Sequence, residues 1–285
     1  MMVDSYQSFS EPLTEEMLFR WHRMVMAGRS DLRDVGRYRT TAEAMQVVSG
    51  AIYRPRVHFE APPASRVPRE MARFISWFRR TAPNGEHPLP ALTRAGIAHL
   101  YFESIHPFED GNGRIGRTIA EKSLSQSVGG PALTSLGATI LARRKEYYAA
   151  LERSSRQNEI TNWLAWFGGV AVEAQRRTIA LIEFLIDKTK LMNRLQGQLN
   201  ERQEKALLRM FQEGPGEFKG GLSAGKYRAI TGSSAATTTR DLADLVVNGA
   251  LVREGERRHA RYHLSVPLRP VPYINIDLKG ELVES

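Results

Sequence analysis

The sequence predicts a mainly α-helical protein: a helical bundle with one small β-hairpin, followed by a C-terminal winged helix-turn-helix domain. Three observations predict this fold class. Apolar residues recur three and four positions apart through most of the chain, which is typical of helices that pack on a core. One stretch near residue 50 is rich in β-branched and aromatic residues around a Ser-Gly pair. Between residues 200 and 266, three short helical patterns precede two strand-like segments.

Length and composition indicate a globular protein with two domains, or with one large and one small domain. The 285 residues are 42% hydrophobic and 25% charged, which is ordinary for this class. Cysteine is absent, so disulfides and thiolate zinc sites are excluded. No apolar run is long enough to span a membrane, and the first ten residues lack a signal-peptide pattern, so we expect a cytoplasmic protein without membrane contact. The net charge of +9 suits phosphate attraction as well as nucleic-acid binding.

The chain opens with a polar arm over residues 1–12, after which Thr14 has the character of a helix N-cap. An apolar stripe that includes Leu18 and Trp21 follows, and we interpret His22 beside it as a packed, hydrogen-bonded histidine rather than a ligand. A hairpin is predicted over about residues 45–59, with its turn at Ser49-Gly50. A two-stranded hairpin is marginally stable alone, so it must lie on the helical body.

The remaining helices of the large domain are predicted from apolar periodicity at 67–78, 91–105, from near 114 to Gly129, 140–151 and 161–199. Adjacent Tyr147 and Tyr148 cannot share one helix face, so one is expected to pack while the other points toward a cleft. His99 lies two helical turns before His106, and without an H-E-x-x-H pattern we interpret it as a core residue.

Residues 106–117, His-Pro-Phe-Glu-Asp-Gly-Asn-Gly-Arg-Ile-Gly-Arg, concentrate groups that handle phosphate. Gly111 and Gly113 allow positive φ or close backbone approach, and consecutive amides in such a loop can form an anion-binding nest. A helix that starts near Arg114 adds its free N–H groups, and Arg114 and Arg117 share a helix face. Asp110 offers a hard oxygen ligand for Mg²⁺ held by substrate phosphates. His106 has a pKa range suited to proton removal.

Two common nucleotide-binding motifs are not favoured by the sequence. The spacing Gly111-x-Gly113-x-x-Gly116 fits the dinucleotide-binding pattern, but the preceding residues 91–105 have helical and not strand periodicity. No G-x-x-x-x-G-K-[ST] segment occurs, so a P-loop is not supported.

Residues 106–117 resemble the core motif of the Fic family, H-x-F-x-[DE]-G-N-G-R-x-x-R, with every fixed position filled. Fic proteins mostly transfer AMP from ATP to a hydroxyl side chain of a target protein, so the resemblance implies a Mg²⁺-dependent protein adenylyltransferase that releases pyrophosphate. It implies that His106 is the general base, Phe108 anchors the loop and Asp110 holds Mg²⁺. It also implies an ATP-binding set, in which the flap and tyrosine members are carried over from the family alone: Val48, Ser49, Gly50, Ala51, Asp110, Gly111, Asn112, Gly113, Arg114, Ile115, Gly116, Arg117, Tyr147 and Tyr148.

The resemblance also bears on partners. In Fic proteins the hairpin is a flap that covers the nucleotide and pairs with the target segment by strand addition; the alternative here is a plain surface hairpin. Many relatives carry an inhibitory helix with [ST]-x-x-x-E-[GN], which is absent from this sequence. Either an N-terminal inhibitory helix is missing, or a separate protein restrains the enzyme, or nothing does. A homodimer and the identity of the target stay open.

Flanking segments and the C-terminal module resemble the Fic subgroup with a winged helix. Helices are predicted at 202–211, 223–230 and 235–247, with strands at 251–253 and 261–264. We therefore expect a Fic domain over 13–199, a winged helix over 200–266, and a tail over 267–285 that adds an edge strand or stays disordered. DNA binding and protein contact are both open for this module. The groups that could approach DNA are Thr237, Thr238, Thr239, Arg240, Arg257, Arg258 and Arg261.

Three functions stay in competition. The first is AMP transfer to a Ser, Thr or Tyr hydroxyl. The second keeps the site but transfers another phosphate-linked group or removes AMP. The third is a DNA-binding regulator whose Fic domain senses a nucleotide.

Overall fold

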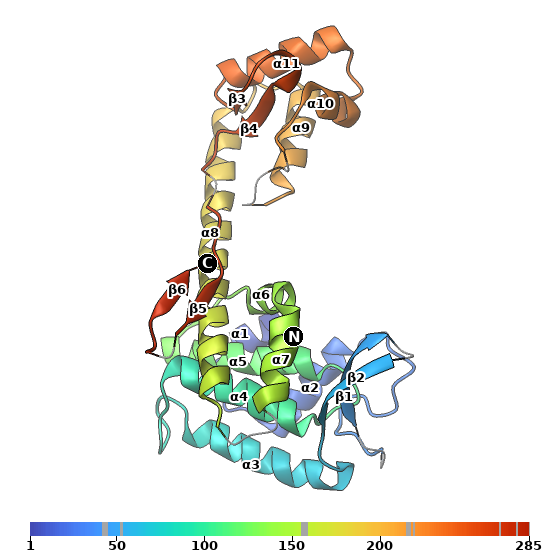
Figure 1. Ribbon diagram of the computed structural model, residues 1–285, viewed down its shortest axis with the longest axis vertical. Coiled ribbons are helices and arrows are strands. Elements are labelled where there is room, and N and C mark those ends of the chain that lie inside the picture. The colour runs from blue at the N-terminus through green and yellow to red at the C-terminus, as the bar shows by residue number, and fades with distance from the viewer. Residues whose placement is uncertain are drawn as a thin grey trace. The chain divides into compact units, whose positions relative to one another are not determined.

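The computed structural model describes residues 1–41, 45–51, 54–154, 159–214, 218, 220–267, 269–277 and 279–284, and Figure 1 shows its helices and strands. The chain forms two compact units. The first contains Met1–Gln175 and Pro272–Ser285, and the second contains Arg176–Val271. Among the helices in the described part of the chain, none combines the length and apolar character needed to cross a membrane.

Helices α4 (Ala91–Ile105) and α5 (Asn112–Val128) lie side by side at the centre of the first unit (Figure 1). Both helices bury residues around most of their circumference; Ala98 and Phe102 of α4 and Ile115 and Ile119 of α5 are fully inaccessible. Burial on all sides is typical of a helix at the centre of a bundle. The short loop that joins α4 to α5 is therefore held between two helices that are buried on most of their faces.

One core cluster packs α2 (Glu15–Val25) and α3 (Val67–Arg80) against this central pair. Trp21, Phe74 and Phe78 are at most 1% exposed within it. The predicted cap of α2 is confirmed, because the side chain of Thr14 accepts a hydrogen bond from the amide of Met17. A short 3₁₀ turn, η1 (Ala64–Arg66), leads into α3.

A second core cluster packs α6 (Leu136–Ala142), α7 (Arg144–Ser154) and the start of α8 (Thr161–Arg194) against the central pair. The prediction of one helix over 140–151 was wrong, because the chain breaks between α6 and α7 at Arg143. This side chain turns into the protein, where it pairs with Glu173 at 3.3 Å and donates to the carbonyl of Ile274. A buried cation that reaches a distant segment has no signal in apolar periodicity.

The tail forms a hairpin of β5 (Ile274–Ile276) and β6 (Leu282–Glu284) that belongs to the first unit. Strand β5 approaches α8 closely, because a Cβ on Gly169 would stand only 2.6 Å from the carbonyl oxygen of Ile274. Ile274 is fully buried there. An edge strand or disorder was expected for this tail, and β5 and β6 instead form a two-stranded sheet of their own.

The N-terminal arm is not extended: residues Met2–Gln7 form helix α1. The hydroxyl of Tyr6 donates to Glu121 of α5 at 2.6 Å, and the buried Lys122 donates to the carbonyl of Ser8. These long-range contacts order a segment whose polar composition gave no periodic signal.

The predicted hairpin is present as the antiparallel strands β1 (Gln46–Ala51) and β2 (Arg54–Glu60). Its turn was placed wrongly, because Ser49 and Gly50 lie within β1, opposite Arg56 and Pro55. The last pair before the connection is Ala51 and Arg54, so the connecting residues 52–53 lie outside the described part.

The second unit contains the end of α8, three helices and a hairpin. The helices are α9 (Glu201–Phe211), α10 (Ala224–Thr231) and α11 (Ala235–Val247), followed by β3 (Leu251–Glu254), the 3₁₀ turn η2 (Arg257–His259) and β4 (Arg261–Leu264). Asp241 is 4% exposed and accepts hydrogen bonds from Arg202, Tyr227 and Asn200, so it joins all three helices. The boundary between the two compact units falls inside helix α8, between Gln175 and Arg176, and α8 itself ends at Arg194, before α9 begins at Glu201.

Candidate active site

The loop between α4 and α5 is shaped by two residues with positive φ. His106 ends α4 in the left-handed conformation, with φ 50° and ψ 61°, and Gly111 precedes α5 with φ 85°. A left-handed conformation at a non-glycine residue costs about 1–3 kcal/mol and is concentrated at functional sites. Gly111 has a second constraint, since a Cβ there would stand 2.7 Å from Cε of Met26.

Two side chains within the loop fix it to the core. Phe108 is fully buried and stacks on His22, with ring centroids 4.1 Å apart. Asn112 is 2% exposed; its Oδ1 accepts from the amide of Phe108, and its Nδ2 donates to the carbonyl of the same residue. The Asn112 side chain is therefore a clamp on the loop, which leaves its main-chain amide as the group that can contact phosphate.

Residues before α3 hold the loop from outside. The buried Arg39 donates from Nε to the carbonyl of His106 at 2.8 Å and from Nη2 to that of Pro62. His22 is confirmed as a packed histidine: it is fully buried and accepts from the amide of Gly36 on Nδ1. Arg39 was missed in the sequence analysis because a lone arginine between loops has no periodic context.

His106 lies in a nearly enclosed position, with 14% of its side chain exposed. Burial lowers the pKa of His106 to about 4, although the main-chain carbonyl of Glu103 and the charge of Asp110 raise it. The ring is therefore neutral near pH 7, which is the form that can accept a proton.

The first turn of α5 presents donors that have no protein acceptor. Within the described residues, neither the amide of Asn112 nor that of Gly113 has an acceptor, because both precede the first intrahelical hydrogen bonds, which start at Arg114 and Ile115. Arg117 is half-buried and has no hydrogen bond or ion pair with any described residue, and its Nη1 lies 3.2 Å from where a Cβ on Gly113 would stand. Arg114 is 46% exposed. Two amides and two guanidinium groups thus gather at one helix start.

Asp110 is exposed to 43% and forms ion pairs with Arg29 at 2.9 Å and with Arg114 at 3.6 Å. The described residues contain no group of three or more histidine or carboxylate side chains that could hold a metal alone. A single accessible carboxylate fits Mg²⁺ that takes its other ligands from substrate phosphates and water. Arg29 occupies this carboxylate in the structure and was not singled out from the sequence.

The other predicted site residues divide by burial. Ile115 and Gly116 are buried on the core side of α5, so they shape the site and do not line it. Tyr147 is 5% exposed and its hydroxyl lies 3.1 Å from Nε2 of His99, so the structure places it and His99 in the core. Tyr148 is half-buried, with Arg144 over its ring at 5.6 Å. For Val48, Ser49, Gly50 and Ala51 only the strand pairing is described.

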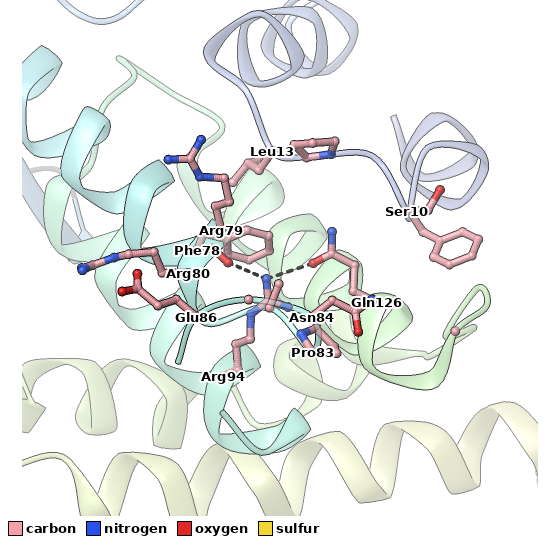
Figure 2. A pocket seen from close by; sticks show the side chains of 15 residues that line it. Ser10, Leu13, Phe78, Arg79, Arg80, Pro83, Asn84, Glu86, Arg94 and Gln126 are labelled. Atoms are coloured by element: carbon pink, nitrogen blue, oxygen red, sulfur yellow. Dashed lines mark hydrogen bonds between the residues drawn. The ribbon is translucent and has the colours of Figure 1, made fainter. Parts of the chain in front are cut away.

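A hollow of about 630 Å³ lies elsewhere, between the end of α3, the loop after it and the segment at residues 9–13. Figure 2 shows Arg94 among its lining residues, with hydrogen bonds to the carbonyl of Phe78 and to Gln126. Burial lowers the pKa of Arg94 to about 10. Thr81 and Ser123 complete its neutral acceptors, so this cation is saturated and serves to join α3, α4 and α5.

Comparison with known proteins agrees with this geometry. Residues 12–124 match the model of the Fic/DOC family. The crystal structure of a Fic family protein from Desulfovibrio desulfuricans G20 aligns with 92% of this chain and 72% of its own, with a TM-score of 0.52 and 26% identity.

Two curated relatives are protein adenylyltransferases. The protein adenylyltransferase Fic of Nematostella vectensis is 29% identical over 147 residues, or 51% of this chain, and protein adenylyltransferase fic-1 of Caenorhabditis briggsae is 29% identical over 134 residues, or 47%. The matched parts are 30% and 22% of those relatives' own lengths. The family match, the aligned fold and the loop geometry coincide on the same helices, and this chain therefore contains a Fic/DOC family domain.

Proposed function

We propose that this chain is a protein adenylyltransferase that transfers AMP from ATP to a Ser, Thr or Tyr hydroxyl of a target protein. The observation that carries the proposal is the start of α5, where two free amides and two arginines gather beside a neutral imidazole. The names of the two curated relatives support the same reaction.

The chain's own groups have distinct tasks in this reaction. The amides of Asn112 and Gly113 hold phosphate oxygens at the positive end of α5, where a helix N-terminus attracts anions. Arg114 and Arg117 hold the outer phosphates and stabilise charge on the leaving pyrophosphate. His106 takes the proton of the target hydroxyl as its oxygen attacks the α-phosphorus and the bond to the β-phosphate oxygen breaks.

Asp110 is the residue that would hold Mg²⁺, because its carboxylate is accessible and faces the same helix start. When bound, the metal neutralises charge on the phosphates. The ion pair between Asp110 and Arg29 must open for this contact, so Arg29 competes with the metal.

The test uses ATP labelled at the α-phosphate, incubated with a cell lysate and either the native chain or His106→Ala. Label on lysate proteins that disappears in the variant is expected. Label from γ-labelled ATP would instead indicate kinase-like transfer, and AMP removal would show as loss of label from a premodified protein. Equal labelling by the variant would remove His106 from the mechanism.

The hairpin β1–β2 is proposed as the docking place of the target segment. Its sheet contains two strands, so each strand has one edge without a strand partner in the described part of the chain. An extended segment can pair with such an edge by strand addition, which would bring a hydroxyl next to the start of α5.

Control of activity is proposed to come from outside the described site. Arg117 pairs with no carboxylate among the described residues, so this phosphate-binding arginine is unblocked, whereas Arg114 pairs with Asp110 at 3.6 Å. Incubation of the purified chain with α-labelled ATP should therefore label the chain itself or an added target. A separate inhibitory protein would reduce this labelling when added back.

The second unit is proposed to be a winged helix. Three helices followed by a hairpin match that plan, and the helix caps at Asn200, Ser223 and Ser234 fix its element boundaries. Arg253, Arg257 and Arg261 line a hollow of about 420 Å³ that Thr239 of α11 also borders, which favours phosphate contact. Binding to a DNA duplex that weakens with added salt and is lost in Arg257→Gln would support a DNA-binding role. Binding that does not depend on salt and is unchanged in Arg257→Gln would count against it.

A further inference from the structure

Glu103 is a buried carboxyl group that the proposed reaction does not yet use. It lies on α4 one turn before His106, is 7% exposed, and its Oε1 has no hydrogen-bond partner among the described residues. Buried polar atoms are nearly always paired, and a buried carboxyl group without partners is costly. An atom of this kind beside a candidate active site calls for a chemical explanation.

Two groups near Glu103 belong to the two ends of the Fic motif. Its Oε2 lies 3.8 Å from Nδ1 of His106, and that nitrogen also lacks a well-formed hydrogen bond. Oε1 of Glu103 and Nη1 of Arg117 both lie beside Gly113. A Cβ placed on Gly113 would stand 3.9 Å from Oε1 and 3.2 Å from Nη1. One carboxyl group therefore faces both the proposed base and the second motif arginine.

The glycines of α5 make room for this carboxyl group. A Cβ on Gly116 would stand 2.7 Å from Oε1 of Glu103 and 3.2 Å from Nδ1 of His99. Any side chain at residue 116 would displace Glu103. This explains Gly116 by packing, since it lies on the core side of the helix and not at the phosphate-binding end.

We propose that Glu103 is a positioning residue: its carboxyl group engages Nδ1 of His106 and faces Arg117, so that Nε2 of His106 is the nitrogen left to take the proton of the target hydroxyl. The role of Nε2 in taking this proton rests on the proposed adenylyl transfer, whereas the contact between Glu103 and His106 does not. An ionised Glu103 accepts a hydrogen bond from Nδ1–H and leaves Nε2 without a proton. A protonated Glu103 donates to Nδ1 and moves the ring proton to Nε2, which removes the base.

Both forms of Glu103 are accessible near neutral pH. Burial raises the pKa of Glu103 to about 7, against the opposing charge of Arg117. Besides the Glu103 carboxyl group at 3.8 Å, the charges of Arg39 and Asp110 and the main-chain carbonyl of Glu103 act on His106. We therefore expect the Nδ1–H tautomer of His106 to increase as pH rises through about 7.

The experiment is ¹⁵N NMR of histidine-labelled protein between pH 5 and 9, with His106 assigned by its loss in His106→Ala. The chain has seven histidines, so the spectrum is tractable. In the native chain, the ¹⁵N shifts of His106 should report the change from Nε2–H to Nδ1–H. Glu103→Gln should abolish the pH-dependent change.

The matched control is Glu121→Gln, because burial also raises the pKa of Glu121 to about 7, yet this carboxylate accepts hydrogen bonds from Tyr6 and Thr134 and not from His106. This control should keep the tautomer change. If Glu103→Gln does not fold, Gly116→Ala displaces Oε1 without changing charge and should shift the transition. A native chain without a tautomer change, or an unaltered change in Glu103→Gln, overturns the proposal.

The tautomer measurement needs neither ATP nor a target, so failure of the adenylyltransferase proposal leaves it interpretable. Where AMP transfer is measurable, Glu103→Gln should lower kcat about tenfold or more with little change in KM for ATP, because transition-state and not ground-state interactions are lost. In the pH profile of kcat, the fall on the acid side near pH 7 should disappear in Glu103→Gln and remain in Glu121→Gln. This difference would separate a positioning role of Glu103 from a general loss of structure.

Discussion

Replacing Asn112 by alanine should unfold the first unit more easily while leaving the start of α5 chemically intact. Asn112 bonds both the amide and the carbonyl of Phe108 at 2.9 and 2.8 Å, and both residues are buried. Without the side-chain amide, both main-chain groups lose their partner inside the protein. Each such loss costs about 1–3 kcal/mol, so we expect a decrease of about 2–6 kcal/mol in the free energy of unfolding.

Tryptophan fluorescence during urea denaturation measures this effect on the correct part of the chain. The four tryptophans, Trp21, Trp77, Trp163 and Trp166, all lie in the first unit, so their emission reports its unfolding. The midpoint should fall in Asn112→Ala without a change in slope, because the slope depends on the surface exposed. Asn84→Ala is the matched control, since Asn84 is exposed. A decrease below about 0.5 kcal/mol, the range of ordinary surface substitutions, would refute the clamp.

Three further outcomes are expected. Arg29→Ala should lower the Mg²⁺ concentration that half-saturates nucleotide binding, because Arg29 pairs with Asp110; an unchanged value would show that Arg29 does not compete with the metal for Asp110. Glu121→Gln should become more stable relative to the native chain as pH rises from about 4.5 to 7. Burial raises the pKa of Glu121 to about 7, so the folded native chain keeps a proton that the unfolded chain releases, and the native chain loses stability over this range. A difference in denaturation midpoints that does not change with pH would contradict this. Arg143→Ala should release the tail hairpin and cost about 3–5 kcal/mol, because it breaks a buried ion pair with Glu173 and a hydrogen bond to the carbonyl of Ile274; proteolysis after residue 267 at the native rate would argue against it.

Local signals explain which elements were predicted well. Thr14 accepts a hydrogen bond from the amide three residues ahead, so the start of α2 was readable from residue type. Apolar spacing likewise identified α3, α4 and α5 within a few residues. The hairpin turn was misplaced because strand register depends on pairing across the sheet, and Ser49-Gly50 was a plausible turn only in isolation.

Contacts between distant residues explain what was missed. The break at Arg143 depends on Ile274, 131 positions away, and the helix of the N-terminal arm depends on Glu121. Tyr147 and Tyr148 were indistinguishable in the sequence, and only packing against His99 and Trp163 places the first in the core.

The sequence by itself determined the chemistry of the loop, because the motif at residues 106–117 names the imidazole, the carboxylate, the glycines and the arginines that a phosphate site requires. Only the tertiary structure decided which of these groups are free to act. The side chain of Asn112 bonds the main chain of Phe108, and Asp110 is paired with Arg29. Glu103 faces His106 in a space that Gly116, which has no side chain, leaves open. The physical reason is that residue identity sets what a group can bond, whereas burial and distance, which are fixed by segments far apart in the chain, set what it does bond.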